Sequence, residues 1–80
     1  MSLNVVLDRF GEIIEGNHYR GYCHISRDTE EDGFFVMVYR EADPQSEVLL
    51  SEWFPSMQAV NHFVRDQSWV VYWQDQHRPL

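Results

Sequence analysis

Residues 34–40 read FFVMVYR, and this stretch decides the class of fold. Apolar side chains occupy both alternating sets of positions from Phe34 to Tyr39, which is typical of a strand covered on both faces. A run of this length suits a strand and is far shorter than the ~20 residues that cross a bilayer. We therefore predict a strand over residues 34–40, with neighbouring structure on both of its sides.

The residues before this strand predict a partner for it. Residues 18–27 alternate in the manner of a strand, and residues 28–33 are rich in acids and turn formers, so the two strands are expected to form a hairpin. One face of the earlier strand carries Tyr19, Cys23 and Ile25, and the other carries His18, Arg20, Tyr22, His24 and Ser26.

The residues after it predict a third strand, a helix and a last strand. Residues 41–46 form a polar turn, and residues 47–53 are expected as the third strand. Ser56 is a suitable N-cap for a helix that runs to about Asp66. Residues 68–74 then predict the last strand, with Trp69, Val71 and Trp73 on one face and Val70 and Tyr72 on the other.

Residues 3–15 predict a helix, and a second interpretation stays open. Ser2 can cap the start of this helix, and Gly16 can end it in the left-handed conformation. Because Gly11 disfavours a helix, the alternative is two short strands at residues 5–7 and 12–14. The helical interpretation rests on one apolar stripe, made of Leu3, Val6, Leu7, Phe10, Ile13 and Ile14.

These elements predict a single α+β domain over residues 1–80, in the order α-β-β-β-α-β, with residues 75–80 as a frayed tail. The expected architecture is a mostly antiparallel sheet of three or four strands with one or two helices packed on it. A right-handed crossover through the second helix would make the flanking strands parallel. The element order through that helix resembles double-stranded-RNA-binding domains. Arg65, however, is the only basic residue between Trp53 and Asp66, so membership in that family is not expected.

Charge and cysteine content restrict the class of function. The formal net charge is −7, from thirteen acids and six bases, and all six bases are arginine. Such a chain is not expected to bind nucleic acid directly or to adsorb to anionic membranes. One cysteine permits no internal disulfide, and the first residues show no signal-peptide pattern, so we expect a cytoplasmic protein.

We expect no enzymatic activity, no cofactor and no metal site. Cys23 and His24 are adjacent, so on a strand they point to opposite faces and cannot readily share an ion or form a nucleophile–base pair. His18 and His24 would lie about 20 Å apart along one face. Glycine-rich phosphate loops and nucleophile-elbow motifs are missing from the sequence. Cys23 is therefore expected to be a small buried apolar residue.

A first candidate for protein contacts is the mixed face that carries Arg20, Tyr22 and His24. Neighbouring strands would extend it into an aromatic–arginine surface if they contribute Phe35, Met37, Tyr39, Val70 and Tyr72. Tyrosine and arginine are enriched at interface hot spots. The alternative is that the N-terminal helix covers this face and leaves Arg20 at its rim.

A second candidate is acidic. Two groups of carboxylates flank the strand over residues 34–40, namely Glu30, Glu31 and Asp32 at one end and Glu41, Asp43 and Glu47 at the other. Spaced carboxylates on a rigid sheet can imitate a phosphate backbone and occupy a basic groove. The alternative is that both groups are ordinary solvated loops.

The expected function is therefore that of a non-enzymatic acidic interaction protein, which binds a protein partner with a basic surface and regulates or inhibits it. A phage or mobile-element inhibitor that occupies a basic nucleic-acid-binding surface fits this description. A homodimeric module is the alternative, because the runs at residues 34–39 and 69–73 are apolar on both faces. A third hypothesis is a small-molecule binder or an enzyme, with a pocket near Tyr22 and His24.

Overall fold

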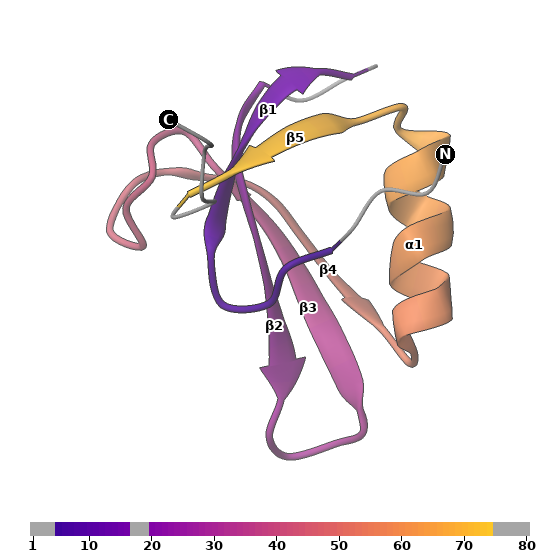
Figure 1. Cartoon of the computed structure of the whole chain (residues 1–80). Helices are drawn as coiled ribbons and strands as arrows, with labels where there is room; N and C mark the ends of the chain where they lie inside the picture. The colour runs from indigo at the N-terminus through magenta and orange to yellow at the C-terminus, as the bar shows by residue number, and fades with distance from the viewer. Residues whose placement is uncertain (1–4, 17–19, 75–80) are drawn as a thin grey trace, which may run out of the picture.

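The computed structural model describes residues 5–16 and 20–74. Within these residues, five strands form one antiparallel sheet in the order β4-β3-β2-β1-β5, and one helix packs on it (Figure 1). This confirms the α+β class, but the order of elements is β-β-β-β-α-β. The elements are β1 (Phe10–Glu15), β2 (Gly21–Asp28), β3 (Gly33–Tyr39), β4 (Val48–Phe54), α1 (Met57–Asp66) and β5 (Val70–Trp73).

The helix predicted over residues 3–15 is wrong, because strand β1 occupies its second half. Burial along β1 alternates with period two, since Gly11 and Ile13 are buried while Glu12 and Ile14 are exposed. A strand at this place pairs with β2 along one edge and with β5 along the other, so backbone amides and carbonyls on both edges form hydrogen bonds. The alternative strand at residues 12–14 is confirmed, whereas residues 5–7 form no strand. The proposed cap Ser2 lies outside the described residues.

The first four strands form an antiparallel meander with short connections. The predicted hairpin between β2 and β3 is confirmed, with Asp28 paired to Gly33 at its closed end. Cys23 and Ile25 face the core, as their alternation predicted, and Tyr22 and His24 lie on the opposite face. Residues 17–19, which include His18 and Tyr19, lie outside the described residues, as does the tail predicted over residues 75–80.

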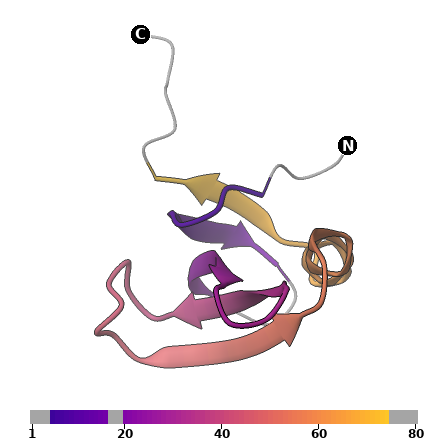
Figure 2. The ribbon, with the colours of Figure 1, turned by 90° about the horizontal axis from the view of Figure 1, so that it is seen from below.

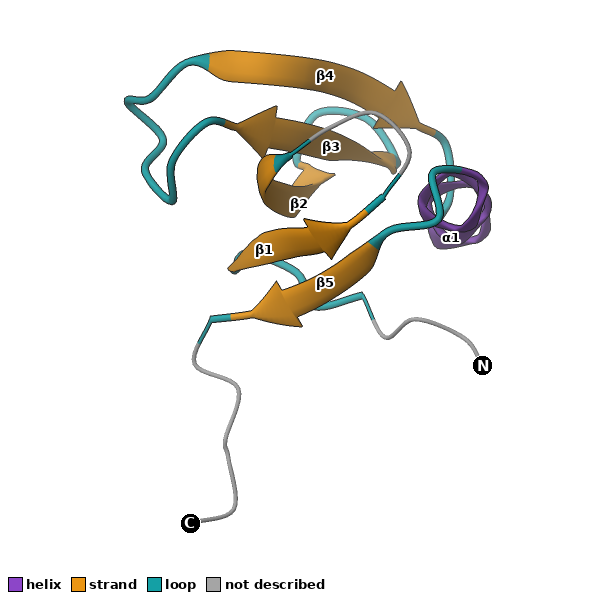
Figure 3. Ribbon diagram, turned by 90° about the horizontal axis from the view of Figure 1, so that it is seen from above, coloured by secondary structure: helices purple, strands orange, loops and turns teal. Residues whose placement is uncertain are grey.

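The last strand returns to the opposite edge of the sheet. Strand β5 pairs antiparallel with β1, so the expected parallel pairing of the strands that flank the helix is wrong. Figure 3 shows the reason: the sheet curls, with β4 at one edge and β5 at the other, and α1 stands between the two edges. Seen end-on in Figure 2, α1 lies where β4 ends and β5 begins. The helix therefore bridges the open side of the curled sheet and does not connect neighbouring strands.

Both ends of α1 are capped as its sequence requires. The Ser56 side chain accepts a hydrogen bond from the Ala59 amide at 3.1 Å, which confirms the predicted N-cap. At the other end Ser68 has a φ of 56°, the left-handed conformation that ends a helix. The amides of Ser68 and Trp69 donate to the carbonyls of Arg65 and Val64, the hydrogen-bond pattern of a Schellman motif.

The core lies between α1 and one face of the sheet, which we call the core face. Val60 and Val64 of α1 are buried in the same cluster as sheet residues such as Ile25 and Val36. The opposite face, here called the outer face, has no described helix on it. The expectation of cover on both sides of β3 is therefore wrong for this face, where Phe35 stays 37% exposed. The buried cluster comprises Ile13, Cys23, Ile25, Val36, Val38, Val60, Val64, Trp69 and Trp73.

Candidate functional site

The outer face is the candidate site, because the pairing of the strands gathers aromatic side chains there. Residues that are directly opposite in antiparallel strands point to the same face, so the register defines three rows across the sheet. Going across, the rows are Tyr72–Glu12–Tyr22–Tyr39, then Phe10–His24–Met37–Ser51, then Ser26–Phe35–Trp53. The residues expected to extend the face of Tyr22 and His24 do lie on it, including Val70.

Phe10 makes ring contacts within the middle row and with the first row. The rings of Phe10 and His24 lie 4.9 Å apart between centroids, in a tilted arrangement. Phe10 also meets Tyr39 edge-on at 5.6 Å, although the two residues lie on strands separated by β2. Such edge and tilted contacts are favourable for aromatic pairs and hold the rings in fixed positions. The middle of the outer face is therefore a packed, half-buried aromatic surface.

The row at the β2–β3 hairpin contains the most exposed aromatic pair. Phe35 and Trp53 are opposite residues on β3 and β4 and are 37% and 39% exposed. The Trp53 Nε1–H donates to a carboxylate oxygen of Asp28 at 3.1 Å. The indole also fills the space where a side chain at Gly33 would lie, since a Cβ there would be 2.3 Å from Trp53 Cζ2. The indole is therefore held by a hydrogen bond and by packing while part of it faces solvent.

The acidic loop at this hairpin lies directly beside Trp53. The second oxygen of Asp28 accepts a hydrogen bond from the amide of Glu30 at 2.9 Å, which folds the loop into an Asx turn. Asp28 thus joins the loop and the aromatic pair. The three acids that follow, Glu30, Glu31 and Asp32, are exposed. Their charges face solvent at one end of the outer face.

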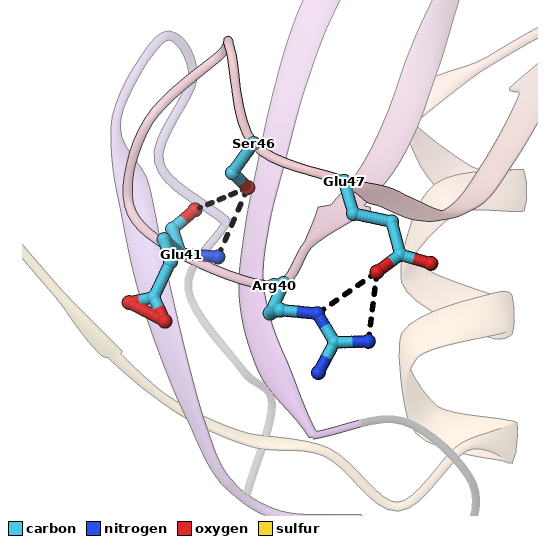
Figure 4. A network of polar contacts seen from close by, with 4 residues as sticks. All are labelled: Arg40, Glu41, Ser46 and Glu47. Carbon is cyan, nitrogen blue, oxygen red and sulfur yellow. Dashed lines mark hydrogen bonds and ion pairs between the residues drawn. The ribbon is translucent and has the colours of Figure 1, made fainter.

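The second acidic loop, residues 40–47, is held by its own polar contacts (Figure 4). The guanidinium of Arg40 binds Glu47 Oε1 through Nε at 2.9 Å and through Nη2 at 2.7 Å. The Ser46 hydroxyl accepts a hydrogen bond from the Glu41 amide at 3.0 Å. Asp43 accepts from the amide of Gln45 at 2.9 Å. The loop therefore presents its carboxylates on an ordered backbone, and one of them, Glu47, is already paired.

The structure does not bring the two predicted acidic groups together. They lie at opposite ends of β3, a seven-residue strand, and so are separated by about 20 Å. Tyr22 and His24 lie between them on the outer face. Arg20 precedes β2 and is exposed, and its Nη1 donates to the carbonyl of Gly16 at 3.0 Å. The predicted aromatic–arginine surface is thus an aromatic surface between two acidic loops. Arg20 is instead bound to the connection between β1 and β2.

Two contributors to this surface were missed from the sequence. Phe10 was assigned to a helix, and its place beside His24 became visible only when β1 formed. Trp53 was assigned to a strand, but its link to Asp28 joins residues that are 25 positions apart. The alternation of Ser51 and Trp53 against Leu50 and Phe54 was a usable signal for the face of Trp53. No local pattern predicts the hydrogen bond to Asp28.

Cys23 lies on the core face and is fully buried, which confirms its assignment as a small apolar residue. Burial removes the thiolate from water and raises the pKa of the Cys23 thiol from 9.0 to about 12, although two backbone hydrogen bonds act in the opposite direction. The thiol is therefore protonated at neutral pH and is a poor nucleophile. His24 points to the other face, so the two side chains do not act on one substrate.

In the part of the chain that the structure describes, no three His, Cys, Asp or Glu side chains are grouped closely enough to hold a metal ion. No helix among the described residues has the length and apolar character needed to cross a membrane. Comparison of the chain with family models, with curated proteins and with solved structures finds no match.

Proposed function

We propose that this chain is a non-enzymatic interaction protein, whose outer face binds a basic surface of another protein and thereby regulates or inhibits it. One observation carries the proposal. An aromatic sheet face, free of any described helix, lies between two acidic loops. Aromatic residues with partial exposure are typical of binding hot spots, and flanking charges select the partner.

The distribution of charge supports a basic partner. The strand positions in the three rows of the outer face include no arginine, and their one acid is Glu12. The whole chain carries −7, so its field attracts cations and repels anions such as nucleic acid.

A basic partner is also favoured over a second copy of the chain. A homodimer through the outer face would bring two acid-flanked surfaces and two charges of −7 together. The apolar residues Ile14 and Val70 at the β1–β5 side are exposed and favour some self-association. Sedimentation at rising concentration distinguishes the two, since a homodimer forms without any partner and a partner-binding monomer does not.

The proposed mechanism is occupation of the partner's basic surface. Basic protein surfaces commonly bind phosphates of nucleic acid, and carboxylates held on an ordered sheet can compete for the same groups. A cytoplasmic nucleic-acid-binding protein is therefore the class of target that we propose. Inhibition follows because the acids and the nucleic acid cannot occupy that surface together.

The test uses two charge reversals that are matched in size. Glu12 and Glu52 are both exposed strand residues, but Glu12 lies on the outer face and Glu52 is opposite Val36 on the core side. Tagged wild-type chain captures proteins from nuclease-treated lysate of the source cell, and a captured basic protein is then purified and titrated. We expect Glu12→Lys to weaken binding about tenfold or more and Glu52→Lys to weaken it far less.

Two controls complete this experiment. Thermal unfolding of both variants shows that each remains folded, and a salt series on the wild type shows that binding weakens as ionic strength rises. Equal losses in the two variants would mean that only net charge matters and that the outer face is not the site. Binding that does not respond to salt would contradict the proposed electrostatic selection.

A further inference from the structure

The exposed pair at the β2–β3 hairpin has a more specific role. We propose that Phe35 and Trp53, with the acidic loop beside them, bind the guanidinium of an arginine side chain on the partner. This inference rests on the proposed function and names the chemical group that the surface recognises. Arginine stacks on aromatic rings, and its charge is attracted to the negative face of the ring.

The same hairpin already contains an arginine–aromatic contact on its other face. Arg27 and Phe34 are opposite residues on β2 and β3, and the Arg27 guanidinium carbon lies 5.4 Å from the centre of the Phe34 ring. The next row, on the outer face, has Ser26 opposite Phe35. Serine is too short to cover that ring. Among the described residues, no cation–π contact to Phe35 accompanies the one that Phe34 has, and an arginine from the partner can take the corresponding place.

Trp53 is fixed in a position that suits this role. Its Nε1–H is bonded to Asp28 and its ring lies over Gly33, so the indole has little freedom to lose when a ligand stacks on it. Both oxygens of Asp28 already accept hydrogen bonds, one from Trp53 and one from the Glu30 amide. Asp28 thus acts as a positioning residue.

The neighbouring acids supply attraction, and the rings supply selectivity. Glu30, Glu31 and Asp32 are exposed beside the pair and attract any cation. A lysine ammonium is compact and strongly hydrated, whereas a guanidinium is planar and gives up its water more easily against a ring. The site should therefore prefer arginine to lysine at equal charge, while the acidic loop alone would discriminate less.

The full chain is titrated with octa-arginine and with octa-lysine at one fixed salt concentration. We expect octa-arginine to bind about 2- to 5-fold tighter because of the ring contacts. Trp53 is the exposed tryptophan among the described residues, since Trp69 and Trp73 are buried, so quenching of tryptophan fluorescence by acrylamide reports on it. We expect octa-arginine to protect Trp53 from acrylamide more than octa-lysine does.

Variants show whether the rings cause the preference. Phe35→Ser should bring the affinities for octa-arginine and octa-lysine closer together, because only charge then attracts the peptides. Val70 is an exposed apolar residue of β5 on the same face, and Val70→Ser should leave the preference for octa-arginine unchanged. Loss of the same preference in both variants, or retention in both, would overturn the assignment. The fluorescence comparison on wild-type chain gives a result even if Phe35→Ser does not fold, and equal protection by the two peptides would overturn it.

The outcomes separate this inference from the proposed function. Equal, salt-sensitive binding of both peptides would remove the arginine site and leave a general basic partner in place. Failure of both peptides to bind at low salt would contradict the basic partner as well.

Discussion

Ile13 and Ile14 are neighbours in β1, yet Ile13 is 3% exposed and Ile14 is 52% exposed. The first lies on the core face with α1 packed over the sheet, and the second lies on the outer face. Both faces carry aromatic side chains, although aliphatic residues dominate the buried cluster on the core face. They differ in what covers them, and this difference assigns stability to one face and, in our proposal, binding to the other.

Aromatic content alone does not identify the core of this protein. Trp69 and Trp73 are buried on the core side, while Trp53 remains partly exposed because its strand position faces outward. Only one helix is available among the described residues, and it covers one face. The outer face therefore keeps exposed apolar residues, to which our proposal assigns the binding of a partner.

The largest expected effect separates the two faces within one strand. Ile13→Ala removes buried methyl groups and leaves a cavity, so we expect a loss of about 2–5 kcal/mol in the free energy of unfolding. Ile14→Ala should cost less than about 1 kcal/mol, because its side chain is half exposed. Urea unfolding measures both. Similar losses would show that the outer face is packed as tightly as the core.

The second effect concerns pH and the core face. The pKa of the Cys23 thiol is about 12 in the folded chain and 9.0 in its ordinary state, so the thiol of the unfolded chain releases its proton first as the pH rises. Burial of the neutral thiol therefore contributes its full stabilisation below pH 9.0, and this contribution is lost as the pH rises toward about 12. Between pH 9 and 10.5, wild type should lose about 1 to 2 kcal/mol in total relative to Cys23→Ala. Parallel stability curves for the two proteins would contradict the burial of the thiol.

The third effect concerns the N-terminal cap of α1, the helix that covers the core face. Ser56→Ala removes the side-chain acceptor for the Ala59 amide and should lower stability by about 1 kcal/mol. Ser56→Asp keeps an acceptor at the same position and should restore most of this loss. Thermal unfolding of the three proteins is the measurement. If alanine and aspartate unfold alike, the cap contributes little to holding α1 on the sheet.

The fourth effect acts on the outer face. Gly33→Ala places a Cβ where the indole of Trp53 lies, so the ring must move and its hydrogen bond to Asp28 is lost. We expect a cost of about 1 kcal/mol, together with stronger acrylamide quenching of Trp53. Trp53→Phe serves as the control, because it identifies the signal from the two remaining tryptophans. Unchanged quenching in Gly33→Ala would mean that the indole is not held over this glycine.

The smallest effect concerns the acidic loop. Glu47→Gln breaks the ion pair with Arg40. The side chains of both residues are more than half exposed. We expect less than about 0.5 kcal/mol from chemical unfolding at low salt, and nothing measurable at high salt. A larger loss would show that this loop contributes to the fold as well as to the charge of the surface.

Local patterns predicted much of the fold. The strands at residues 34–40 and 47–53, the hairpin between β2 and β3, and the helix with its cap Ser56 are all confirmed, with boundaries shifted by a few residues. Residues 3–15 were misassigned because Phe10 and Ile13 share one side of a helix at this spacing, whereas in strand β1 they lie on opposite faces of the sheet. The choice between these two structures depends on pairing with β2 and with β5, and β5 lies far along the chain.

The sequence by itself determined the acidity of the chain, its lone cysteine and most of its elements, because charge, alternation and capping are local properties. It also placed Tyr22 and His24 on the face opposite Cys23. The tertiary structure alone decided that β5 pairs with β1, that α1 covers one face, and that Asp28 meets Trp53. Those outcomes depend on contacts between distant residues, whose free energy is gained only when the whole sheet has assembled.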